Sequence, residues 1–96
     1  MTREDIVQRI AERRADLGRL GVRSLALFGS VARDEAGRES DVDLLVEFSE
    51  PVGLFRFLDV KAYLEDLLGC QVDLVTSDAL KPGLRERVLQ EAVNAL

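Results

Sequence analysis

Three aspartates stand within apolar runs, and their spacing indicates a shared site. Asp41 and Asp43 open the apolar run that ends at Phe48, and Asp73 stands alone inside a later run. Alternate side chains of a β-strand point to the same face, so Asp41 and Asp43 share one, and Asp73 can present a third carboxylate to it. At ~5 Å and an effective dielectric near 20, each pair of carboxylates repels by about 3 kcal/mol. The cluster therefore indicates a bound cation, and an all-oxygen site suits Mg²⁺ or Mn²⁺.

A glycine and a serine precede this cluster. Gly29 and Ser30 follow the apolar run 24–28, and Ser30 stands eleven positions before Asp41. Gly29 has no side chain to obstruct a phosphate, while Ser30 offers a hydroxyl and, at a helix start, a backbone amide. Protein carboxylates and substrate phosphates commonly share Mg²⁺, and two ions about 3.5–4 Å apart can stabilise both oxygens of an in-line displacement. These parts suit phosphoryl or nucleotidyl transfer.

The composition excludes several other classes of protein. The net charge of −5 argues against broad nucleic-acid binding, which depends on Lys and Arg that neutralise phosphates. With no histidine, zinc sites that need imidazole and Ser-His-Asp catalysis are excluded. No apolar run approaches the ~20 residues that span a membrane, and no signal peptide is visible. We therefore expect one cytoplasmic domain over residues 1–96, with a single cysteine and no internal disulfide.

Hydrophobic periodicity and turn residues predict the elements that position these groups. Helices are expected over 2–20, 54–68 and 84–96, and strands over 24–28, 41–48 and 71–75. The order predicts an α/β or α+β domain, a small mixed sheet with helices packed mainly on one face. In the middle helix, Leu54, Leu58 and Leu64 are expected to face the core, and Phe55 is expected to pack.

Two segments resemble the signature of a known family. Residues 27–33 (Leu-Phe-Gly-Ser-Val-Ala-Arg) and 40–48 (Ser-Asp-Val-Asp-Leu-Leu-Val-Glu-Phe) are similar to the minimal nucleotidyltransferases of the DNA-polymerase-beta-like superfamily. Residues 72–75 fall where that family places its third acidic strand. One departure is Asp34, which stands where glycine often follows the Ala-Arg pair. A different local turn and weaker nucleotide binding are the expected consequences.

The resemblance implies a role for each candidate residue. Gly29 and Ser30 would hold the triphosphate of ATP or another NTP. Asp41 and Asp43 would bind metal, and Asp73 would complete the metal site and help to deprotonate the acceptor hydroxyl. The cofactor implied is Mg²⁺, as two ions, with Mn²⁺ as a substitute, and the fold implied is that of the polymerase-beta-like nucleotidyltransferases.

The resemblance also implies a partner. Proteins of this type act as the antitoxin of a toxin–antitoxin pair and adenylylate a tyrosine of a HEPN-domain ribonuclease toxin, so a hetero-oligomer is expected. The residues themselves indicate only metal-dependent nucleotidyl transfer. An alternative is a catalytically silent antitoxin that neutralises its partner by contact, and another is a subunit whose site a second chain completes.

Each candidate residue also has a structural interpretation. Either aspartate of the pair alone would suit an ordinary strand edge, and Asp73 would suit the solvent face of an edge strand. Arg33 fits a phosphate contact or a structural ion pair equally. Glu47 shares the face of Asp43 but lies ~13 Å along the strand, so we leave it out of the metal site. Cys70 is interpreted as a small apolar residue.

Overall fold

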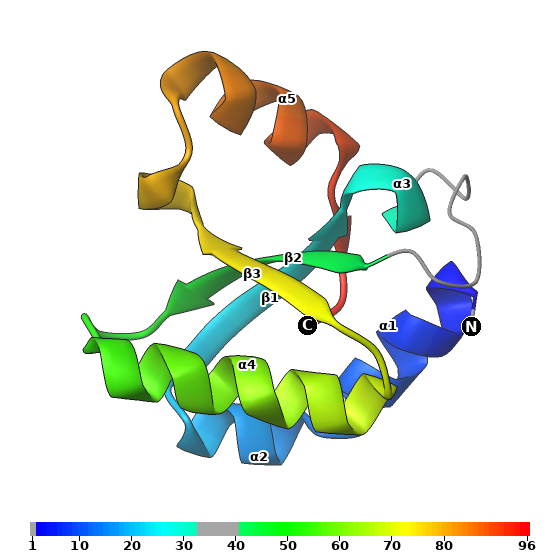
Figure 1. Ribbon diagram of the computed structural model, residues 1–96, viewed down its shortest axis with the longest axis vertical. Coiled ribbons are helices and arrows are strands. Elements are labelled where there is room, and N and C mark those ends of the chain that lie inside the picture. Colours follow the sequence, from blue (N-terminus) through cyan, green and yellow to red (C-terminus); the bar gives the residue numbers. More distant parts are fainter. Residues whose placement is uncertain (1, 33–40) are drawn as a thin grey trace.

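A mixed β-sheet forms the centre of this protein. The computed structural model describes residues 2–32 and 41–96, without the side chains of residues 30 and 31. Within these residues the sheet has four strands in the order β3-β2-β1-β4 (Figure 1). They are β1 (Val22–Phe28), β2 (Val42–Phe48), β3 (Val72–Thr76) and β4 (Val93–Asn94). β1 pairs antiparallel with β2 and β4, and β2 pairs parallel with β3. The predicted small mixed sheet is confirmed.

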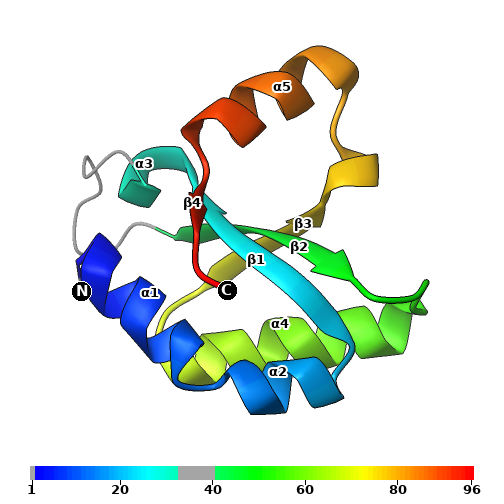
Figure 2. The same cartoon turned by 180° about the vertical axis from the view of Figure 1, so that it is seen from behind.

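The helices lie mainly on one face of this sheet. α1 (Arg3–Ala11), α2 (Arg14–Arg19) and α4 (Leu54–Leu68) cover that face, and α5 (Pro82–Glu91) lies on the opposite side (Figures 1 and 2). α3 (Gly29–Ala32) follows β1 directly, and the short 3₁₀ helix η1 (Ser77–Ala79) follows β3. No helix in the described ranges has the length and apolarity needed to cross a membrane. The predicted fold class, with helices mainly on one face, agrees with this arrangement.

The N-terminal segment forms two helices where the sequence predicted one. Thr2 begins α1 with a capping box, in which Thr2 and Asp5 each accept a backbone N–H of the other. The chain leaves helical geometry at Arg13, whose φ is −109° and ψ 20°. Because of this break, α1 packs against α4 while α2 packs against β1. Ile10 and Leu17, on either side of it, are both fully buried.

The last predicted helix ends earlier than expected. Residues 84–96 were expected to be helical, but α5 ends at Glu91, and Ala92 is extended with φ −68° and ψ 140°. The chain then forms β4 along the edge of β1, where the N–H of Ala95 donates to the carbonyl of Leu25 at 2.9 Å. The edge of β1 would otherwise present unpaired backbone groups, and pairing with it also buries Ala95 to 4% exposure.

The middle helix has its predicted bounds, and Leu64 is buried as predicted, but the N-terminal part of the predicted core face is not. Leu54 and Leu58 are 69% and 45% exposed, and Phe55 is 84% exposed, so the prediction that they pack against the core is wrong. The buried stripe consists of Val60, Leu64 and Leu68. At about 100° per residue, Leu58 lies roughly 160° around the helix from Val60, so one face cannot bury both.

Candidate active site

A glycine turns the chain from β1 into α3. Gly29 has φ +74°, a backbone conformation that side chains disfavour. A Cβ atom added to Gly29 would lie 2.2 Å from Oδ2 of Asp43, closer than any real contact. The backbone of Gly29 and the carboxylate of Asp43 therefore meet at the end of β1, and any side chain larger than hydrogen would force them apart.

The strand register brings two of the predicted aspartates side by side. Asp43 is paired with Phe28 of β1 on one side and with Asp73 of β3 on the other. Neighbouring strands lie about 4.8 Å apart, so the two carboxylates project from adjacent positions of one row. Val42 and Leu44 are buried in the core, so Asp43 projects from the opposite face by alternation. Asp43 is half-buried and Asp73 is exposed.

The third predicted aspartate lies just before β2. Asp41 is exposed, and the next residue ties it to β3, because the N–H of Val42 donates to the carbonyl of Gln71 at 3.1 Å. Burial, and then the negative charges of Asp41 and Glu65, raise the pKa of the Cys70 thiol above its ordinary value. Asp41 therefore lies close enough to the start of β3 for its charge to act there.

The structure covers the two remaining candidate residues, Ser30 and Arg33, only in part or not at all. Ser30 is the second residue of α3, and its side chain is not among the described atoms. Arg33, together with Asp34, lies outside the described residues. The end of α3 is held from α1, since Nη1 of Arg3 donates to the carbonyl of Ala32 at 2.9 Å. This contact fixes the backbone of the segment that carries Ser30.

The donor set fits a magnesium ion that is shared with a substrate. No group of three acidic, cysteine or histidine side chains is positioned to hold a metal ion by itself within residues 2–32 and 41–96. Mg²⁺ is usually bound by one or two carboxylates plus substrate phosphates, and Asp43 with Asp73 supplies such a pair beside the open backbone of Gly29. Glu47 forms an ion pair with Arg23 instead. The ligand roles of the three aspartates stay predictions.

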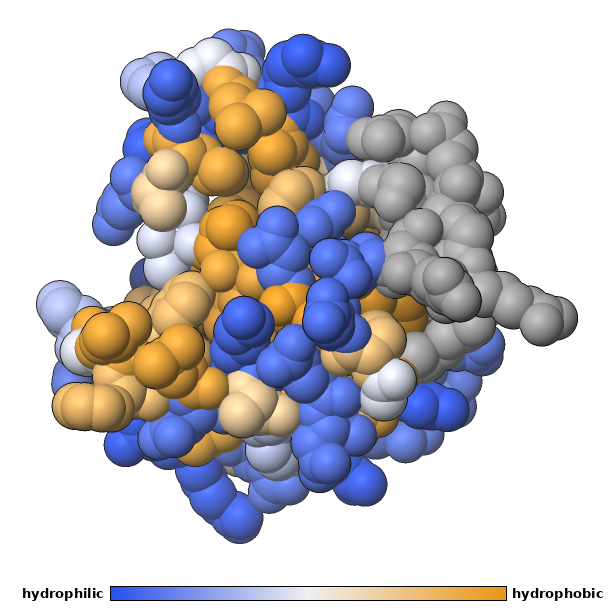
Figure 3. Space-filling model, viewed as in Figure 1, coloured by the Kyte–Doolittle hydropathy of each residue, from blue (hydrophilic) through white to orange (hydrophobic). Residues whose placement is uncertain are grey.

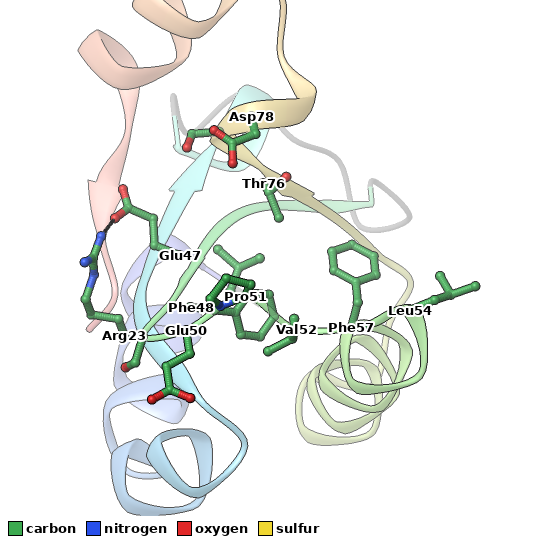
Figure 4. Close-up of a pocket in the computed structure, with 14 residues that line it drawn as sticks. Arg23, Glu47, Phe48, Glu50, Pro51, Val52, Leu54, Phe57, Thr76 and Asp78 are labelled. Carbon is green, nitrogen blue, oxygen red and sulfur yellow. Dashed lines mark hydrogen bonds and ion pairs between the residues drawn. The ribbon is translucent and has the colours of Figure 1, made fainter.

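A separate cavity of about 700 Å³ lies between η1 and the turn that joins β2 to α4. Figure 4 shows Phe57 and Val52 bordering it, with Thr76 and Asp78 on the side of η1. None of the candidate aspartates lines it, and neither does Gly29. Glu47 does line it, so the cavity lies farther along the strand that carries Asp43. The sequence indicated only a turn here, because nothing in its periodicity shows that a strand end, a helix start and η1 converge.

Comparisons with known proteins agree with this geometry. The model of the nucleotidyltransferase domain family matches residues 7–94. The chain is 44% identical over 94 residues to protein adenylyltransferase MntA of Thermococcus cleftensis, which covers 97% of this chain and 95% of that protein. A candidate protein adenylyltransferase of Methanocaldococcus jannaschii is 43% identical over 76 residues, covering 79% of this chain and 82% of that protein.

Solved structures show the same fold. The structure of a candidate minimal nucleotidyltransferase matches with a TM-score of 0.84 and 43% identity, covering 97% of this chain and 95% of that one. A structure of a tri-AMPylated Shewanella oneidensis HEPN toxin in complex with its MNT antitoxin matches with a TM-score of 0.66 and 18% identity, covering 94% of this chain and 71% of that one. The likeness of fold therefore extends well beyond close relatives. The chain belongs to the nucleotidyltransferase domain family, as one of its minimal members.

Proposed function

We propose that this protein is a Mg²⁺-dependent adenylyltransferase that moves AMP from ATP to a hydroxyl of a partner protein. The observation that carries the proposal is the row formed by Asp43 and Asp73 beside the backbone of Gly29. Two carboxylates next to a backbone without a side chain suit a triphosphate with its metal ion. Mn²⁺ is expected to substitute for Mg²⁺, because both prefer oxygen ligands.

Different residues of the chain have different roles in the transfer reaction. Gly29 and Ser30 contact the triphosphate, and Asp41, Asp43 and Asp73 hold the metal. Mg²⁺ held there would neutralise phosphate charge and activate the acceptor oxygen. Asp73 accepts the proton of the acceptor hydroxyl, and the acceptor oxygen bonds to the α-phosphorus of ATP. The bond between the α-phosphorus and the oxygen that bridges it to the β-phosphate breaks, and pyrophosphate leaves. Asp73 suits this role because it is exposed on β3, an end strand of the sheet.

We further propose that the acceptor is a HEPN-domain toxin, bound as a hetero-oligomer in the cytoplasm. The names of the relatives support a protein acceptor: the Thermococcus cleftensis protein is a protein adenylyltransferase. A fold neighbour was solved with an AMPylated HEPN toxin. A large exposed apolar surface often marks a protein interface, and Figure 3 shows one over the N-terminal end of α4. We call it the α4 patch; its residues are Leu54, Phe55 and Leu58.

Intact-mass spectrometry of the HEPN-domain partner tests transfer. After incubation with ATP and Mg²⁺, wild type should add the mass of one or more adenylyl groups, and the variant D41N/D43N should add none. Neutralisation of the toxin should then persist after the two proteins are separated. A toxin that is inhibited but unmodified, equally by wild type and the double variant, would instead identify a contact-only antitoxin.

The α4 patch has a matched control on α5. L54D/L58D places charge on the patch, whereas L84D/L89D does the same to leucines of α5 that are 50% and 52% exposed. We expect the first variant to lose partner binding while still binding Mn²⁺ and ATP, and the second to retain both. Equal losses in both variants would remove the patch from the proposal and leave the transfer chemistry standing.

A further inference from the structure

A glutamate outside the predicted site links α4 to the strand that carries Asp73. Glu65 lies in the last turn of α4 and is half-buried. Its Oε2 accepts the backbone N–H of Val72, the first residue of β3, at 3.1 Å. Its own carbonyl accepts the N–H of Gly69 at 2.8 Å, where the helix ends in a left-handed turn. One residue thus fixes both ends of the short connection between α4 and β3.

The pattern of the parallel ladder explains why this bond matters. The N–H of Val42 donates to the carbonyl of Gln71, so Gln71 and Asp73 direct their backbone groups toward β2. The backbone N–H of Val72 must therefore point away from β2. Among the described residues β3 is the end strand of the sheet, so no strand there lies beyond it to accept that N–H. The carboxylate of Glu65 supplies the missing acceptor.

We infer that Glu65 is a positioning residue for Asp73, which it holds in register with Asp43 by anchoring the first residue of β3. The inference rests on the proposed function, because the position of Asp73 matters only if that carboxylate serves the metal and the acceptor. Mg²⁺ demands near-ideal ligand geometry, and a displacement of about 1 Å can cost a hundredfold in rate. The neighbour Asp66 is exposed, and in the described part of the chain its carboxylate accepts no hydrogen bond from β3.

Three substitutions of Glu65 separate the hydrogen bond from the charge. E65Q removes the charge but keeps an oxygen that accepts the N–H of Val72. E65D keeps the charge but withdraws the oxygen by the length of one C–C bond, ~1.5 Å. E65A removes both, and D66A is the control that removes a neighbouring charge without touching β3. The probe is Mn²⁺ with ATP, titrated by calorimetry, together with amide hydrogen exchange at Val72.

We expect E65A and E65D to bind Mn²⁺–ATP about tenfold more weakly, the lower end of the effect of removing a residue that orients a ligand. The amide of Val72 should exchange faster in both, and kcat of transfer should fall more than KM rises. E65Q and D66A should match wild type in all three measurements. Because E65D and E65Q are close in size to glutamate, they decide the question even if E65A fails to fold.

Two results would overturn the inference: E65D that binds Mn²⁺–ATP as wild type does, or E65Q that loses as much affinity as E65A. The second result would mean that the charge of Glu65 matters and its hydrogen bond does not. Failure of the proposed function looks different, since wild type itself would then bind no Mn²⁺–ATP.

Discussion

The two faces of β2 differ sharply in the side chains they carry. Three even-numbered residues of the strand are 3% exposed or less and form part of the core beneath α1, α2 and α4: Val42, Leu44 and Val46. Phe48, at the end of the strand, is half-buried against that core. The odd-numbered positions carry Asp43 and Glu47, with Leu45 between them buried to 3% exposure. Because side chains alternate, one strand can support the fold with one face and carry charge on the other. It follows that substitutions at adjacent positions of β2 can change catalytic activity and stability separately.

On the open face, D43N should have the largest effect on activity. Losing a metal ligand removes several kcal/mol of stabilisation from the transition state, so transfer should fall about a thousandfold. The melting temperature should not fall, because the change relieves repulsion with Asp73. Transfer to the partner, followed by mass, and thermal unfolding measure the two effects. Transfer within tenfold of wild type would remove Asp43 from the chemistry.

On the covered face, L44A should do the reverse. Leu44 is fully buried, and truncating such a leucine costs about 3 kcal/mol, which for a domain of this size lowers the melting temperature by roughly 12–24 °C. Transfer measured well below the melting temperature should change little. A loss of activity without a loss of stability would mean that the two faces are not separable in this way.

At the junction of the two faces, G29A should affect both properties by smaller amounts. A positive φ costs alanine about 1–2 kcal/mol, and the new Cβ would displace the carboxylate of Asp43. Gly21 is the control: its φ is +89°, and an added Cβ meets only side-chain atoms of Phe48 and Val52 at 4.0 Å. G21A should lose similar stability with no loss of transfer, whereas G29A should lose both. Equal transfer in the two variants would contradict the close approach at Gly29.

The smallest effect is expected for Y63F on the covered side. The hydroxyl of Tyr63 donates to Oδ2 of Asp16 at 2.9 Å, so its removal should cost about 1 kcal/mol at pH 7 and leave transfer unchanged. Burial, and then this bond, raise the pKa of Tyr63 above its ordinary value of 10.0. The folded state therefore keeps the proton longer than the unfolded state, and the bond's contribution is lost as the pH rises through the raised pKa. The melting temperatures of wild type and Y63F should converge at that pH. A difference between them that stays constant with pH would contradict the hydrogen bond.

Local patterns predicted the features that depend on neighbouring residues. Alternation placed Asp43 on the face opposite the core, and the turn signals around 51–53 and at Gly69 gave the middle helix its bounds. Asp41 lies just before β2, so the face it shares with Asp43 stays a prediction. The apolar-Asp-apolar triplet at Asp73 indicated a carboxylate on the same face. The register that sets Asp73 directly opposite Asp43 needed the structure, because pairing depends on the parallel crossover through α4.

Features that depend on distant parts of the chain were missed for the same reason. Val93 continues an apolar period that suits a helix, but it forms a strand with Asn94 by pairing with the edge of β1. Leu58 was assigned to the core from helical periodicity, whereas the crossing of α4 over the sheet decides which side of the helix is covered, and it buries Val60. The acceptor role of Glu65 has no signal in the sequence, since it depends on Val72 belonging to an end strand.

The two edges of the sheet bear on how any other chain can attach. β4 closes one edge with only two residues, and at the other edge the first outward N–H of β3 is already taken by Glu65. Short or blocked edge strands are poor templates for the addition of a further strand, which is how many sheets aggregate or capture extended peptides. We therefore expect this sheet to resist growth by backbone pairing, so that a partner must be recognised through side chains on the faces of the protein.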